Sequence, residues 1–189
     1  FSCYHGYFLS TDSWLIILIL IGLTGFYALP VLPQSKNLRS LGGLKIFLVA
    51  TVWSGITVIL PCTEIGKILV WDNWVEVVQR LLVVLVLMIP FEIRDLAFDK
   101  PELKTIPQRI GVTKTKIFGS SMVVLFFFLT FLKDEISELE LIAKGMFFLI
   151  LGGLMFATKR DQTKYFASFW VESVPIFWWI AIWGLTFYY

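Results

Sequence analysis

The sequence predicts an all-α integral membrane protein with six transmembrane helices. Three observations lead to this fold class: the composition, the spacing of the apolar stretches, and the distribution of Lys and Arg between them. Of the 189 residues, 58% are hydrophobic and 16% are charged, whereas a soluble domain carries about 25% charged residues. A soluble domain of this length leaves roughly a third of its chain surface in water. The composition therefore excludes a soluble globular domain, a disordered chain and a secreted disulfide scaffold.

Six apolar stretches approach the length of about 20 residues that a helix needs to cross a bilayer. They are continuous and do not alternate between apolar and polar residues, which argues against membrane-spanning strands. We expect the six to form one polytopic membrane domain over residues 1–189. The predicted spans are Trp14–Leu32, Leu44–Leu60, Val70–Phe91, Ile117–Leu132, Leu139–Thr158 and Phe166–Tyr188.

The basic residues predict the orientation of the spans. The loops after the first, third and fifth spans hold three, six and three of the 16 Lys and Arg residues, which makes twelve. The intervening loops hold only Lys67 and Lys133. The positive-inside rule makes the basic loops cytoplasmic and places both termini on the outer side. The net charge of +2 is too small to indicate a nucleic-acid partner.

The start of the chain indicates a longer polypeptide. It begins with Phe1 in place of Met, and its first dozen residues lack the Lys and Arg of a signal peptide. We expect an interior piece or a trimmed form, incomplete at its N-terminus. Cys3 and Cys62 are too few for a disulfide framework. The single histidine, His5, is expected to be a solvated surface residue.

The connection between the third and fourth spans carries the candidate chemistry. Pro90 is expected to break the third span near its cytoplasmic end. Asp95 and Asp99 follow at an i,i+4 spacing, which places both carboxylates on one face of a helical turn. Mg²⁺ prefers a few carboxylates together with phosphate oxygens and water. The basic residues around this pair, which can neutralise a diphosphate, are Arg94, Lys100, Lys104 and Arg109.

A simpler interpretation of this connection stays open. Loops that obey the positive-inside rule contain Lys and Arg for topology alone. Carboxylates four residues apart are also common on exposed helices. The pair of acids and its basic neighbours can therefore be a solvated helix face without a ligand.

The segment EIRDLAFDKPELKTIPQRIG resembles the second aspartate-rich motif of the UbiA superfamily of intramembrane prenyltransferases. That motif runs Asp-x-x-x-Asp, then a basic stretch, Thr-Leu-Pro and a later Gly. The matching residues are Asp95, Asp99, Lys100, Thr105-Ile106-Pro107 and Gly111. Tyr27-Ala-Leu-Pro30 followed by Lys36 resembles the family's Tyr-containing span end. The resemblance covers roughly Tyr27–Lys45 and Pro90–Gly111, and the other spans match in hydropathy and number.

The resemblance implies a fold and a function. The six spans would be helices four to nine of a nine-helix bundle around a central cavity. The activity would be Mg²⁺-dependent transfer of a prenyl group from a prenyl diphosphate to an aromatic or other lipophilic acceptor. Asp95 and Asp99 would be the catalytic, Mg²⁺-binding residues. The expected substrate-binding residues are Arg94, Lys100, Arg109 and Lys36 at the phosphates and Tyr27 near the diphosphate.

The family's first motif, Asn-x-x-x-Asp-x-x-x-Asp, has no counterpart in this sequence. The only acid before Glu64 is Asp12, which is predicted to lie outside. Two explanations stay open: the chain lacks the earlier helices, or its lineage has dispensed with the motif. A non-catalytic membrane protein on the same fold, binding a lipid or a partner, is therefore the alternative to an enzyme.

Glu172 lies inside the sixth predicted span, three residues before Pro175. An ionisable residue within a membrane is by default a functional candidate, since its exposure to lipid costs about 2.5 kcal/mol or more. One interpretation is an ion or proton site of a small transporter. The other is a bond to a neighbouring helix or a place near the interface. The i,i+4 pairs Glu76–Arg80 and Glu140–Lys144 are expected to be local ion pairs.

Overall fold

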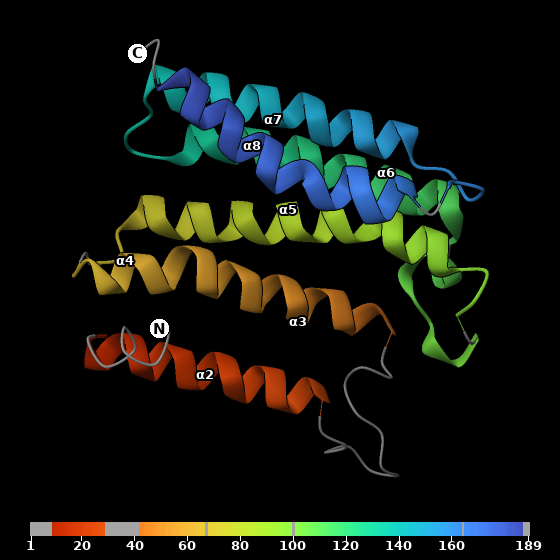
Figure 1. Cartoon of the computed structure of the whole chain (residues 1–189), viewed down its shortest axis with the longest axis horizontal. Helices are drawn as coiled ribbons and strands as arrows, with labels where there is room; N and C mark the ends of the chain where they lie inside the picture. Colours follow the sequence, from red (N-terminus) through yellow and green to blue (C-terminus); the bar gives the residue numbers. More distant parts are fainter. Residues whose placement is uncertain (1–8, 29–41, 67, 100, 164, 187–189) are drawn as a thin grey trace. The chain divides into compact units, whose positions relative to one another are not determined.

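The structure, a computed structural model, describes residues 9–28, 42–66, 68–99, 101–163 and 165–186. Within these ranges every regular element is a helix and none is a strand (Figure 1). The chain divides into two compact units, Phe1–Leu81 and Leu82–Tyr189. The boundary falls inside the long helix α5 (Trp71–Asp95), so each unit contains part of it.

Five helical segments in the described ranges are long and apolar enough to cross a membrane, which indicates a multi-pass membrane protein. Helices suit this environment because they satisfy their backbone hydrogen bonds internally. The segments are Gly43–Glu64, Trp71–Asp95, Ile106–Leu132, Glu138–Ala157 and Phe166–Leu185. They overlap the second to sixth predicted spans. The first predicted span falls on α2 (Thr11–Ala28), where the apolar stretch Thr11–Gly25 is shorter, so a count of six stays a prediction.

Unit 1 contains α2 packed against one continuous helical rod. The rod consists of α3 (Gly42–Ser54), the π-helix η3 (Gly55–Ile59) and α4 (Leu60–Glu64), and α2 contacts all three parts. A Cβ atom at Gly55 would lie 2.8 Å from Cδ2 of Leu20. Glycine at this position therefore allows α2 and the π-helix to approach closely, as small residues do between membrane helices.

Polar contacts join the start of α2 to the end of α4. The Ser13 hydroxyl donates to Oε2 of Glu64 at 2.5 Å, and the Ser10 amide donates to the same oxygen at 3.2 Å. Ser13 is completely buried. Since a buried hydroxyl is costly without a partner, the Glu64 carboxylate satisfies Ser13 at the helix junction.

Unit 2 contains the second part of α5 and the remaining helices. These are η4 (Pro101–Leu103), α6 (Ile106–Phe128), η5 (Leu129–Leu132), α7 (Glu138–Ala157), η6 (Phe166–Val171) and α8 (Glu172–Leu185). Helix α7 packs against both α6 and α8. Most of the fully buried side chains lie in this unit, and they include Leu85, Ile89, Ile93, Val123, Leu151, Met155 and Val171.

Helix α5 buries one face along its length. Val75, Leu82, Val86, Ile89 and Ile93 are all buried and recur at spacings of three, four or seven residues. This periodicity is that of an α-helix with an apolar face. The packing of this face fixes the direction in which the last turn of α5 presents its polar residues.

Two expectations about helix ends are wrong. Pro90 does not break the third span, because α5 continues through it to Asp95. The proline removes one backbone donor, and the buried side chains of Ile89 and Ile93 keep the helix in place on either side. The fourth span does not begin at Ile117, since α6 begins at Ile106. Hydropathy reported the apolar part of this helix and missed its polar first turns.

The two local ion pairs expected within helices are confirmed. Nη2 of Arg80 lies 3.8 Å from Oε1 of Glu76, and Nζ of Lys144 lies 2.7 Å from Oε1 of Glu140. Lys133 also donates to Glu140, so two ammonium groups share one carboxylate.

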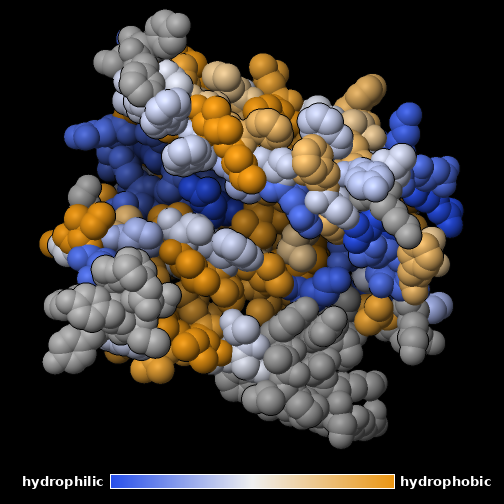
Figure 2. Space-filling view, in the orientation of Figure 1, coloured by the Kyte–Doolittle hydropathy of each residue, from blue (hydrophilic) through white to orange (hydrophobic). Residues whose placement is uncertain are grey.

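On the face shown in Figure 2, hydrophilic residues gather near the helix ends of unit 2.

Candidate functional site

The two aspartates of the candidate motif lie on one turn of backbone at the end of α5. Helix α5 ends at Asp95, and the amides of Phe98 and Asp99 both donate to the Asp95 carbonyl oxygen at 2.8 Å. The bond from Asp99 has the i→i+4 spacing of an α-helix. The local geometry of Asp95 and Asp99 is therefore that of one further helical turn.

Arg94 forms an ion pair with the neighbouring Asp95. Nε of Arg94 donates to Oδ1 at 2.7 Å, and Nη2 donates to Oδ2 at 3.3 Å. This two-pronged geometry is the strong form of an arginine–carboxylate contact. The side chains are 26% and 40% exposed, so solvent screens the pair. An incoming anion can therefore compete with Asp95 for the guanidinium.

Three further groups surround Arg94. Nη1 donates to the Ser168 hydroxyl at 3.0 Å, and the guanidinium carbon lies 5.2 Å from the centre of the Phe91 ring. The Glu172 carboxylate is near enough to attract Arg94 electrostatically. Ser168 lies on the π-helix η6 and Glu172 is the first residue of α8. Single π-helical turns are frequent at functional sites. This one leads directly into α8, and its Ser168 hydroxyl accepts a hydrogen bond from Arg94 at the end of α5.

A pocket of about 460 Å³ opens beside this network. The connection between α7 and η6 forms part of its wall, and Nε2 of Gln162 ties that connection to α5 by donating to the Pro90 carbonyl oxygen at 2.6 Å. Two guanidinium groups, a carboxylate, a carboxamide and a hydroxyl share the pocket. Its lining residues are Arg94, Asp95, Ala97, Phe98, Arg160, Gln162 and Ser168.

The rest of the motif shapes the connection between α5 and α6. At the start of α6 the Thr105 amide donates to Oε1 of Gln108 at 3.0 Å, and Pro107 lies in the first turn, as helix N-termini favour. Nε2 of Gln108 also donates to the Asp99 carbonyl oxygen at 3.4 Å. Gly111 has φ 81° and ψ 162° and interrupts α6, a conformation that glycine adopts without strain. These residues hold the segment after Asp99 in place.

The structure brings together only some of the predicted site residues. Arg94 and Asp95 line the pocket, and Glu172 interacts with Arg94. Arg109 does not line the pocket, and its Nε donates to the Lys104 carbonyl oxygen at 2.8 Å. Lys36 and Lys100 lie outside the described residues, and so does the side chain of Tyr27.

Sequence reasoning missed three residues of this pocket. Arg160, Gln162 and Ser168 come from the connection between α7 and η6 and from η6 itself. Their only signal in the sequence was the basic character of that loop, which topology alone explains. Ser168 is 74 residues from Arg94, a separation that no local spacing rule reaches.

Asp95 and Asp99 are the magnesium ligands that the resemblance implies. In the part of the chain that the structure describes, no three His, Cys, Asp or Glu side chains are grouped closely enough to hold a metal ion. Mg²⁺, however, commonly takes one or two carboxylates and completes its shell with water and substrate phosphates. Asp95 and Asp99 share one turn of backbone, and of the two only Asp95 lines the pocket. Binding would require Asp95 to give up at least part of its contact with Arg94.

Comparison with protein-family models, with curated proteins and with solved structures finds no match to this chain.

Proposed function

We propose that this chain is a UbiA-type membrane protein that binds a prenyl diphosphate at the end of α5 and transfers its prenyl group to a lipophilic acceptor. One observation carries the proposal: the Arg94–Asp95 pair, one turn before Asp99, opens into a pocket that also contains Arg160. Guanidinium groups bind phosphate oxygens through paired hydrogen bonds. Carboxylates beside them supply the ligands that Mg²⁺ requires when it bridges to phosphate.

An apolar groove beside the polar pocket also supports an amphiphilic ligand. The π-helix η6 contributes Ser168 to the polar pocket, and it contributes Phe166 and Trp170 to a groove of about 540 Å³ against α7. Gly153 and Ala157 of α7 line the groove from the other side. One side of η6 therefore offers polar groups for an anionic head, and the other side offers an apolar groove for a hydrocarbon tail.

The side chains have distinct roles in this proposal. Asp95 and Asp99 would hold Mg²⁺, which when bound neutralises the diphosphate and so favours its departure. Arg94 would turn one of its two bonds from Asp95 to a phosphate oxygen, while Ser168 and Phe91 keep its guanidinium in position. The roles inferred from the resemblance for other side chains remain part of the proposal: phosphate contacts by Lys36, Lys100 and Arg109, and a place near the diphosphate for Tyr27.

The test is binding of a radiolabelled prenyl diphosphate by the full chain in nanodiscs, with Mg²⁺ or with EDTA. We expect binding that requires Mg²⁺ and falls at least about tenfold, equivalent to ~1.4 kcal/mol, in Asp95→Asn and in Asp99→Asn. Asp134→Asn, an exposed acid before α7, removes the same charge elsewhere and should bind normally. Binding that persists in EDTA, or that both site variants retain, overturns the assignment of the site.

The same preparation separates the enzyme from its alternatives. Prenylated acceptor should accumulate when a lipophilic aromatic acceptor is added, and tight binding without product would favour the non-catalytic protein on the same fold. The transporter alternative depends on Glu172 as a carrier of protons or ions. Its electrostatic attraction to Arg94 favours a structural role beside the pocket. Proton flux in proteoliposomes that Glu172→Gln abolishes would reverse that preference.

A further inference from the structure

We propose a second lipid site, in unit 1: a groove between α2 and the α3–η3–α4 rod that binds an anionic phospholipid of the bilayer. The acyl chain lies in the groove, and the headgroup lies at the end that carries Lys45. This site is independent of the proposed prenyl transfer. It uses none of the residues of the pocket at the end of α5.

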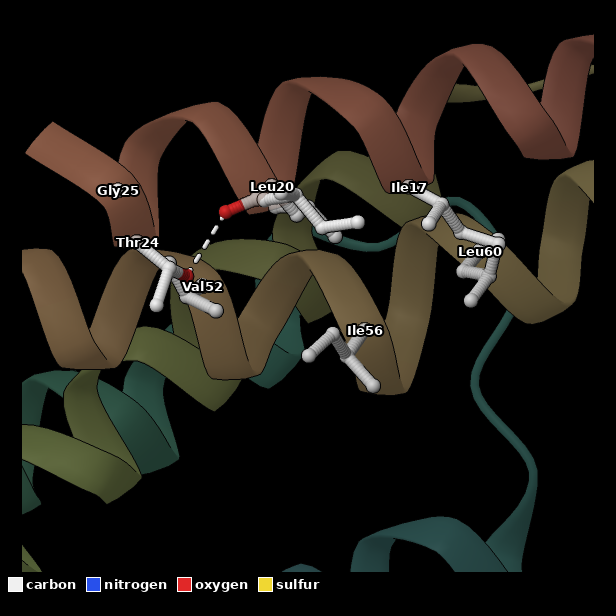
Figure 3. A pocket seen from close by; sticks show the side chains of 8 residues that line it. Ile17, Leu20, Thr24, Gly25, Val52, Ile56 and Leu60 are labelled. Carbon is white, nitrogen blue, oxygen red and sulfur yellow. Dashed lines mark hydrogen bonds between the residues drawn. The ribbon is translucent and has the colours of Figure 1, made fainter.

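The groove has the size and surface of a hydrocarbon site. Its volume is about 490 Å³, and its walls come from two helices that face each other (Figure 3). The Thr24 hydroxyl donates to the Leu20 carbonyl oxygen in its own helix at 2.8 Å (Figure 3). That bond satisfies the hydroxyl locally and leaves an apolar wall. The lining residues are Ile17, Leu20, Ile21, Thr24, Gly25, Val52, Ile56 and Leu60.

Several lining residues show how the groove is kept open. Gly25 offers no side chain, and a Cβ atom built there meets nothing within 4 Å. Ile56 lies on the π-helix and remains 43% exposed. The close contact of Leu20 with Gly55 sets the distance between the two helices. The packing of the two helices therefore leaves the groove open beside that contact.

The two ends of the groove differ in charge. Thr24, Gly25 and Val52 lie at one end, and Ile17 and Leu60 lie at the other (Figure 3). Lys45 precedes Val52 by seven residues in α3, a spacing that places both on one face of the helix. The opposite end of the helix pair carries the Glu64 carboxylate. The end near Val52 is therefore cationic, and the end near Leu60 is acidic.

The sequence of this helix pair and its connection is basic. From residue 13 to residue 63 the sequence contains Lys36, Arg39 and Lys45 and no Asp or Glu. Basic pockets between membrane helices on the cytoplasmic side attract anionic lipid headgroups, and a lysine can extend its stem along apolar surface to reach a phosphate. A prenyl diphosphate fits less well, because residues 13–63 contain no carboxylate for Mg²⁺. An anionic phospholipid is the occupant that matches both the apolar wall and the cationic end.

The experiment is photo-crosslinking of the full chain in nanodiscs that mix phosphatidylcholine with phosphatidylglycerol. The probe is either lipid with the same photoactivatable acyl chain, and the labelled peptides are identified by mass spectrometry. We expect phosphatidylglycerol to label residues 17–25 and 52–60 more strongly than phosphatidylcholine does. High salt should reduce this preference, because it screens the headgroup contact.

Substitutions at Lys45 test whether the preference for phosphatidylglycerol depends on the charge of this residue. Lys45→Gln should lower labelling by phosphatidylglycerol about fivefold, the change that ~1 kcal/mol per basic residue produces, whereas Lys45→Arg should retain it. Lys159→Gln, an exposed lysine of unit 2, removes the same charge and should leave the preference unchanged. Ile56→Trp, which fills the groove, should reduce labelling by both lipids.

Three results would overturn the proposal. One is equal labelling by the two lipids in the parent chain. The second is a preference that survives Lys45→Gln or high salt. The third is displacement of the phosphatidylglycerol probe by a prenyl diphosphate, which would make this groove a substrate site. The salt series uses the parent chain alone, so it decides the question even if a variant fails to fold.

Discussion

Gly119→Ala tests the packing that holds α5, and with it the candidate site, against α6 and α7. A Cβ atom at Gly119 would lie 2.6 Å from Sδ of Met155 and 2.7 Å from Cδ1 of Ile89. Both neighbours are 1% exposed. Although the contacting atoms are the ends of flexible side chains, the surrounding interior is close-packed. The new methyl group must therefore displace side chains that have little free space.

The expected magnitude combines two opposing effects. Overpacking a well-filled core costs about 1–3 kcal/mol, whereas alanine in place of glycine within a helix gains about 1 kcal/mol. The net loss of stability for Gly119→Ala is then about 0–2 kcal/mol. Gly152→Ala in α7 is the matched control, because a Cβ atom there meets nothing within 4 Å. The difference between the two variants cancels the helix propensity and isolates a packing cost of about 1–3 kcal/mol.

Unfolding in mixed micelles by titration with sodium dodecyl sulfate, followed by tryptophan fluorescence, measures this difference. Gly152→Ala should unfold at the same or higher detergent fraction than the parent, and Gly119→Ala should unfold at a clearly lower fraction than Gly152→Ala. Equal stability of the two variants would refute the reasoning, because it would mean that α5, α6 and α7 are not in contact at Gly119.

Two further predictions concern single hydrogen-bonding side chains. Ser168→Ala removes the partner of Nη1 of Arg94 and should weaken prenyl diphosphate binding about fivefold, a modest loss because the bond is exposed; an unchanged dissociation constant would contradict the positioning role. Lys116→Met removes the ammonium that donates to the Thr158 carbonyl oxygen at 2.6 Å at the end of α7 and should destabilise the chain by ~1–3 kcal/mol in the same detergent titration. The exposed Lys114→Met should change stability by no more than about 0.5 kcal/mol, so an equal loss in both variants would exclude the capping role of Lys116.

The positions of the helices were largely predictable, because each depends on an unbroken run of apolar residues. The ends were less so. Pro90 is a helix breaker in isolation, yet α5 passes through it because Ile89 and Ile93 are buried on either side. The early start of α6 depends on the bond that the Gln108 side chain accepts from the Thr105 amide, which a hydropathy profile does not register.

Part of the candidate site was also predictable from the sequence, and part was not. The i,i+4 spacing of Asp95 and Asp99 was readable, because a helical turn is a local structure. The partners of Arg94 were not readable, because Ser168 and Glu172 are more than 70 residues away from it in the sequence. Glu172 stood out in the sequence as an ionisable residue in an apolar run, but its proximity to Arg94 did not.

The sequence by itself determined the class of the protein and the basic character of its alternate loops. Lipid imposes these as local requirements, since each span must be about 20 residues of apolar helix and each basic residue contributes to topology independently. The tertiary structure alone decided what surrounds the motif: the bond from Arg94 to Ser168 and the pocket shared with Arg160. It also decided the groove between α2 and α3. Those features depend on side-chain packing between separate helices, and packing is a property of shape that composition and spacing do not encode.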